Sequence, residues 1–152
     1  MPASQRIVQV SLFLVAAIAL FGGTVQLLTG QPETTPRLDN VHRFMGGVYL
    51  SLGVISLWAG ATVRQQGTLV YLLAFAVLMA AVGRLLSMSK VGLPEPHGVW
   101  LAYLASELVF PVVIAAAHWA TQRHLPGKIY RDVAGADAPL EFAEDKERQR
   151  AP

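Results

Sequence analysis

Three charged residues stand inside otherwise apolar stretches of this sequence: Arg43, Arg84 and Glu107. If those stretches are helices that cross a membrane, each charge should face the protein interior and pair with an opposite charge, because an unpaired charge at membrane depth is costly. At 1.5 Å per residue, the three lie about 5, 8 and 14 Å below the same membrane face. We therefore predict an ion pair from Glu107 to Arg84, to Arg43 or to both.

Polar residues at a similar depth complete a candidate ligand site near that face. The predicted ligand-binding residues are Asn40, His42, Arg43, Arg84, Ser87, Tyr103 and Glu107. Gln26 is near enough in depth to join them. A carboxylate flanked by two arginines should stay ionised, which argues against a proton carrier near neutral pH. Two arginines and one glutamate leave one positive charge in excess. This charge favours an anionic head group, or a polar carbonyl or quinone-like ligand. The alternative is a structural role, because a buried Arg–Glu pair can fix helix register and do nothing else.

Proline interrupts the same region of the fourth apolar stretch. One stripe of that stretch holds Tyr103, Glu107, Pro111, Ile114 and His118, at spacings that share a helix face. Because Pro111 has no N–H, the backbone carbonyl of Glu107 is freed beside its own carboxylate. This carbonyl adds a further polar group to the candidate site.

Other kinds of site find little support. Acidic and histidine side chains near the loops could meet by proximity: Glu33, Asp39, His42, Glu95 and His97. None of them forms a tight ligand pair on one helix, so we predict no metal site. The chain has no cysteine, no phosphate-binding glycine loop and no Ser–His–Asp arrangement. We predict no catalytic residue and no cofactor, and favour a protein that is not an enzyme.

The elements that must position these residues are four apolar blocks. The chain has 152 residues, of which 53% are hydrophobic and 14% are charged. The blocks span residues 7–29, 41–63, 67–89 and 98–120, about 23 residues each, where about 20 suffice to cross a bilayer as a helix. We predict an all-α, four-helix transmembrane bundle with short loops over residues 1–120. Residues 121–152 are predicted to form a polar, mobile, cytoplasmic tail.

Small residues predict how these helices pack. Gly46, Gly53, Ser56 and Gly60, together with Tyr49, form a stripe in the second block that permits close approach of another helix. The third block has a similar stripe of Ala76, Ala80, Gly83 and Ser87. The second helix should be capped by Asp39 or Asn40 and end at Arg64. The short connection after it predicts that the second and third helices are antiparallel neighbours.

Loop charges predict the orientation. One side of the membrane carries Arg6, Arg64, Arg123, Lys128 and Arg131, and the other carries only Arg37 and Lys90. The excess predicts a cell-membrane protein with both termini in the cytoplasm. An uncleaved first helix is favoured over a cleaved signal, because the apolar run continues to Leu28 without an Ala-x-Ala site. The net charge of +2 does not indicate nucleic acid, since basic residues form no stripe with aromatic residues.

Three segments carry a resemblance to a known family: DNVHRFMGGVY in the second block, GRLLS at 83–87 and ASELVFP at 105–111. They resemble a bacterial group of small four-helix membrane proteins, the domain-of-unknown-function 4345 family, over roughly residues 5–120. The group is distantly similar to DoxX-like four-helix proteins, some of which are linked to quinone or redox systems. The resemblance implies the four-helix fold, and no catalytic residue is transferred from it.

Two classes of function remain open. The first is a non-enzymatic membrane component that binds a lipid or quinone-like ligand, a partner membrane protein or a second copy of itself through the polar pocket. The second is a small transporter or a membrane-embedded enzyme that uses the same pocket. A transporter should show broken helices in repeated halves, and only Pro111 hints at that.

Overall fold

The computed structural model describes residues 1–124, which form four long helices and one short 3₁₀ turn. The helices are α1 (Ala3–Thr29), α2 (Pro36–Ala61), α3 (Thr68–Val91) and α4 (His97–His124), with η1 (Val63–Gln65) between α2 and α3. Residues 1–124 contain no strand, so the predicted all-α class is confirmed. All four helices are long and apolar enough to cross a membrane. The predicted tail begins inside α4, and its remainder from residue 125 lies outside the described residues.

Helix α2 begins earlier and ends earlier than the sequence indicated. Its N-cap is Thr35, whose side chain accepts a hydrogen bond of 3.3 Å from the amide of Leu38. Pro36 follows at the first helical position, where its fixed φ angle suits a helix and its missing N–H has no cost. The predicted caps at Asp39 or Asn40 are therefore wrong, as is an end at Arg64, which lies in η1.

Helices α1 and α2 form a tightly packed antiparallel hairpin. Gly46, Gly53, Ser56 and Gly60 of α2 are buried, so the predicted small-residue stripe is confirmed as a packing face. A Cβ atom on Gly23 of α1 would lie 2.8 Å from the carbonyl oxygen of Gly46. Only glycine allows two helix backbones to approach this closely.

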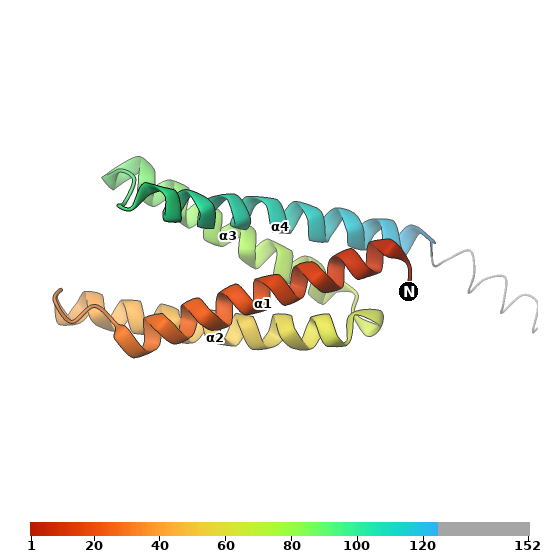
Figure 1. Cartoon of the computed structure of the whole chain (residues 1–152), viewed down its shortest axis with the longest axis horizontal. Coiled ribbons are helices and arrows are strands. Elements are labelled where there is room, and N and C mark those ends of the chain that lie inside the picture. Colours follow the sequence, from red (N-terminus) through yellow and green to blue (C-terminus); the bar gives the residue numbers. More distant parts are fainter. Residues whose placement is uncertain (125–152) are drawn as a thin grey trace, which may run out of the picture.

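Helices α3 and α4 form a second hairpin, and α1 packs against α4 to join the two (Figure 1). Helices α2 and α3 make few contacts, so the prediction that they are close neighbours is wrong. The reason lies in the connection 62–67, where the 3₁₀ turn carries the chain across from one hairpin to the other. A short connection keeps the ends of two helices close, but it does not decide which helix faces pack together.

Helix α3 packs through a different face from the predicted one. Its buried residues are Val70, Leu73, Ala74, Val77 and Ala81. Of the predicted stripe, Gly83 and Ser87 are exposed. Larger aliphatic side chains bury more apolar surface when they pack against the rest of the protein. A stripe of small residues is favourable only where another helix approaches closely.

The two hairpins meet at one end of the molecule and diverge toward the other (Figure 1). We call the end with the N-terminus and the connection 62–67 the closed end, and the end with the connections 30–35 and 92–96 the open end. The apolar core extends from the closed end to about the middle, with Leu12, Ala59 and Ile114 fully buried. Hydrogen bonds reinforce the closed end: Thr121 Oγ1 lies 2.8 Å from Ser4 Oγ, and His118 Nε2 lies 3.1 Å from the carbonyl oxygen of Gly67.

A pair of adjacent glycines tests the close α1–α2 contact. A Cβ on Gly46 would lie 2.9 Å from the amide nitrogen of Leu27, whereas one on Gly47 meets nothing within 4 Å. Gly46→Ala should therefore lower the free energy of unfolding by about 1–3 kcal/mol, as overpacking does in other cores. Gly47→Ala should not lower it, because alanine is the better helix former. Thermal unfolding in mild detergent checks both, and an unchanged Gly46→Ala variant would contradict the tight contact.

Candidate functional site

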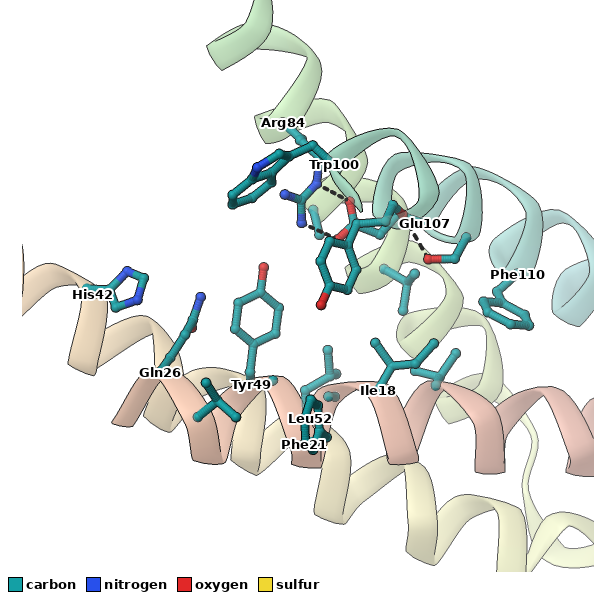
Figure 2. Close-up of a pocket in the computed structure, with 18 of the residues that line it drawn as sticks. Ile18, Phe21, Gln26, His42, Tyr49, Leu52, Arg84, Trp100, Glu107 and Phe110 are labelled. Atoms are coloured by element: carbon teal, nitrogen blue, oxygen red, sulfur yellow. Dashed lines mark hydrogen bonds and ion pairs between the residues drawn. The ribbon is translucent and has the colours of Figure 1, made fainter. Parts of the chain in front are cut away.

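A cavity of about 530 Å³ lies between the two hairpins in the open half of the molecule (Figure 2). Side chains from all four helices line it. The apolar walls include Val15, Ile18, Ala19, Phe21, Val25, Leu52, Val77, Ala80 and Phe110. The polar and aromatic part includes Gln26, Gln31, His42, Tyr49, Arg84, Trp100, Tyr103, Ser106 and Glu107. The cavity is therefore amphipathic, as ligand pockets for small apolar molecules usually are.

An ion pair between α3 and α4 forms its polar part. Arg84 Nε donates to Glu107 Oε2 at 2.9 Å, and Arg84 Nη2 donates to Glu107 Oε1 at 2.7 Å. The two side chains are only 18% and 13% exposed. This two-point arrangement is the strong form of an Arg–carboxylate pair, and it satisfies both charges inside the protein. The predicted pair between Glu107 and Arg84 is thus present.

Aromatic rings surround the arginine. The guanidinium carbon of Arg84 lies 5.4 Å from the centre of the Trp100 ring and 5.6 Å from that of Tyr103. Cations within about 6 Å of an aromatic ring centre are attracted to the face of the ring. From the other hairpin, Tyr49 points its hydroxyl toward this cluster (Figure 2). The ion pair is therefore bordered by aromatic rings, which present flat and largely apolar surfaces to the cavity.

Hydrogen-bonding capacity remains in the cavity after these contacts. A guanidinium has five N–H donors, and the pair with Glu107 uses one on Nε and one on Nη2, which leaves three. Gln26 turns its amide nitrogen toward the cavity, while its Oε1 is buried without a hydrogen-bond partner in residues 1–124 (Figure 2). Buried polar atoms without partners are uncommon, and this one leaves an unused acceptor in the wall of the cavity.

Arg43 lies outside the cavity and has a different role. Its Nε donates to Asp39 Oδ2 at 3.0 Å, and its Nη1 donates to the carbonyl of Leu27 at 2.7 Å. A cation at the C-terminal end of α1 is favourable, because the last carbonyls of a helix carry partial negative charge. Arg43 therefore fastens α2 to the end of α1, and the prediction that it could pair with Glu107 is wrong. Asp39 also accepts from the amide of Gln31 at 2.6 Å, which anchors the connection 30–35.

Of the other predicted site residues, some line the cavity and some lie outside it. His42 and Tyr103 line the cavity with Arg84 and Glu107. Asn40 and Ser87 are exposed and do not line it. Within residues 1–124, no three histidine or acidic side chains lie close enough together to hold a metal ion.

Several cavity residues were not assigned to the site from the sequence. Tyr49 was assigned to the packing stripe of α2, and neither Trp100 nor Phe110 was given a role in the site. The signal for Tyr49 was its size, since a large aromatic residue in a stripe of glycines does not suit close packing. Trp100 lies one helical turn before Tyr103 and two turns before Glu107 on α4. The sequence of α4 alone did not show that α3 would bring Arg84 beside Trp100.

Four apolar helices that enclose a partly buried ion pair define the class: this is a membrane protein. A family model described as "Domain of unknown function (DUF4345)" matches residues 6–118, and the chain belongs to this family. The resemblance inferred from the three sequence segments is therefore confirmed. No match was found among curated proteins or among solved structures.

Removal of the Glu107 carboxylate tests the ion pair. Glu107→Ala leaves Arg84 partly buried without its counter-charge, so the free energy of unfolding should fall by about 3 kcal/mol. Glu107→Gln should cost less, because its amide oxygen still accepts a hydrogen bond from Arg84. Melting temperatures in mild detergent check the order. Equal values for the wild type and both variants would show that the pair contributes nothing.

Proposed function

We propose that this protein is a multi-pass component of the cell membrane that binds a small amphipathic molecule, a lipid or a quinone-like compound, between its hairpins. It acts by binding and not by catalysis. The observation that carries this proposal is the cavity of about 530 Å³ with one ion pair at its polar part and aliphatic walls beyond it. Pockets for small molecules commonly enclose about 300–1,000 Å³, with a few polar groups that orient the ligand.

The shape of the fold supports a ligand from the bilayer. The hairpins diverge at the open end (Figure 1), and Ile18 and Phe21, which line the cavity, are exposed, so an amphiphile in the surrounding lipid can reach the cavity from the side. The apolar walls suit a hydrocarbon tail, because aliphatic side chains give it surroundings as apolar as the lipid that it leaves. The remaining N–H groups of Arg84 suit oxygen atoms of a head group.

Native mass spectrometry of the protein from mild detergent tests the proposal. The wild type should carry a small molecule of defined mass, and Arg84→Gln should lose it, because the substitution replaces a charged group of five N–H donors with a neutral amide of two donors on a shorter side chain. Arg43→Gln is the matched control. It removes the same charge from the same end of the protein, but Arg43 does not line the cavity, so this variant should keep the ligand.

The outcomes separate the proposal from its alternatives. A bare wild-type protein would indicate that the Arg84–Glu107 pair is structural. A protein subunit or a second copy of the chain in place of a small molecule would indicate that the surface serves an interaction between membrane proteins. Equal loss of ligand from Arg84→Gln and Arg43→Gln would place binding outside the cavity.

The proposed orientation places both termini in the cytoplasm and the open end toward the outside. It follows from the basic residues Arg6, Arg64 and Arg123 at the closed end, against Arg37 and Lys90 at the open end. A reporter fused after Pro152 should be active only in the cytoplasm. A fusion that is active only outside the cytoplasmic membrane would reverse the orientation, and with it the membrane leaflet that the cavity faces.

A further inference from the structure

We propose that the cavity selects ligands whose head group is uncharged and carries carbonyl or hydroxyl oxygens, and that Glu107 is the residue that excludes anionic head groups. This inference rests on the proposed function, because it assumes that the cavity holds an amphiphile. It replaces the expectation of an anionic ligand, which depended on two arginines beside one glutamate. The structure places only one of those arginines at the cavity.

The charges at the cavity are balanced. Among the described residues that line it, the full charges are Arg84 and Glu107, apart from the titratable His42. The Arg84 charge is engaged by both oxygens of Glu107, at 2.9 and 2.7 Å. The second arginine, Arg43, is engaged by Asp39 and the end of α1 instead. A phosphate or carboxylate in the cavity would therefore meet the negative charge of Glu107 beside the positive charge of Arg84, and repulsion from the first would offset part of the attraction to the second.

An anion would also lose its hydration on entry. A buried charge is tolerated where an opposite charge can pair with it. In this cavity the cation, Arg84, is already paired with Glu107. Like charges placed side by side are one of the means by which binding sites reject the wrong ligand. Glu107 therefore supplies both the counter-charge that keeps Arg84 inside the membrane and the repulsive element against anionic lipids.

An uncharged oxygen finds suitable partners in the same place. Three N–H donors of Arg84 remain after the pair is formed, and the Tyr49 hydroxyl points toward the pair from the opposite hairpin (Figure 2). A carbonyl or hydroxyl oxygen accepts from such donors without bringing a second negative charge. The rings of Trp100 and Tyr103 provide flat walls beside the head group. Ile18 and Phe110 extend the apolar wall beyond it for the tail (Figure 2).

The test compares three amphiphilic probes that differ in the head group, and two of them, the dioleoyl lipids, have the same tails. Decylubiquinone has an uncharged ring with carbonyl oxygens, dioleoylglycerol has an uncharged head without a ring, and dioleoylphosphatidylglycerol is anionic. Each is titrated into the wild-type protein in mild detergent, and occupancy is measured by native mass spectrometry. We expect at least one uncharged probe to bind about tenfold or more tightly than the anionic one, and the stronger of the two identifies the source of the head group.

The decisive variant is Glu107→Gln. It keeps a hydrogen-bond acceptor for Arg84 but leaves the arginine charge without a counter-charge, so affinity for dioleoylphosphatidylglycerol should rise by about tenfold or more. Asp39→Asn is the matched control. It removes one carboxylate beside Arg43 at the same end of the protein but outside the cavity, so it should produce no such rise. Elution volume and melting temperature confirm that each variant is folded.

Two results would overturn the inference while leaving the proposed function in place. One is a wild-type preference for the anionic probe that Arg84→Gln abolishes. The other is a Glu107→Gln variant that binds an uncharged probe but gains no affinity for the anionic one. Binding of none of the three probes by the wild type would overturn the inference, and together with a bare protein on purification it would also overturn the proposed function.

Discussion

A charged side chain within a lipid bilayer must find its counter-charge inside the protein, and in this chain that requirement is met by the Arg84–Glu107 pair. The two residues are 23 positions apart and belong to different helices, so the pair forms only when α3 and α4 are aligned in one register. The aromatic cluster of Trp100 and Tyr103 around the guanidinium depends on the same alignment. The polar part of the cavity and its balanced charge are thus consequences of one interaction.

The cavity itself arises from a difference between the two hairpins. Helices α1 and α2 approach through glycine, so closely that a Cβ added to Gly23 would lie 2.8 Å from the carbonyl oxygen of Gly46. The hairpin of α3 and α4 instead packs through larger side chains and an ion pair. The hydrogen bond from Thr121 of α4 to Ser4 of α1 joins the hairpins at the closed end, and His118 bonds there to Gly67 at the start of α3. Nothing comparable joins α2 to α3 within residues 1–124, and the hairpins diverge where the cavity lies.

The candidate site could be predicted only in part, for physical reasons that differ between residues. Arg84 and Glu107 could be found because a charged group at membrane depth stands out in an apolar stretch, and Tyr103 because it lies at a similar depth. Arg43 satisfied the same criterion and was misplaced, because Asp39 lies one helical turn away and the open carbonyls of α1 lie beside it. Depth along a helix is readable from the sequence, whereas the direction in which a long side chain turns depends on which partner is nearer. Tyr49 and Trp100 enter the site only through contacts across helices.

The apolar character and number of the helices, the close-packing face of α2 and the family could be predicted from the sequence, because each depends on the order of residues along one segment. The packed helices were needed to show which helices are neighbours, which of the two arginines meets Glu107, and that a cavity with balanced charge separates the hairpins. These features depend on the relative rotation and tilt of helices. In a nearly uniform apolar sequence many rotations bury similar surface, so the choice falls to a few specific contacts between residues far apart in the chain.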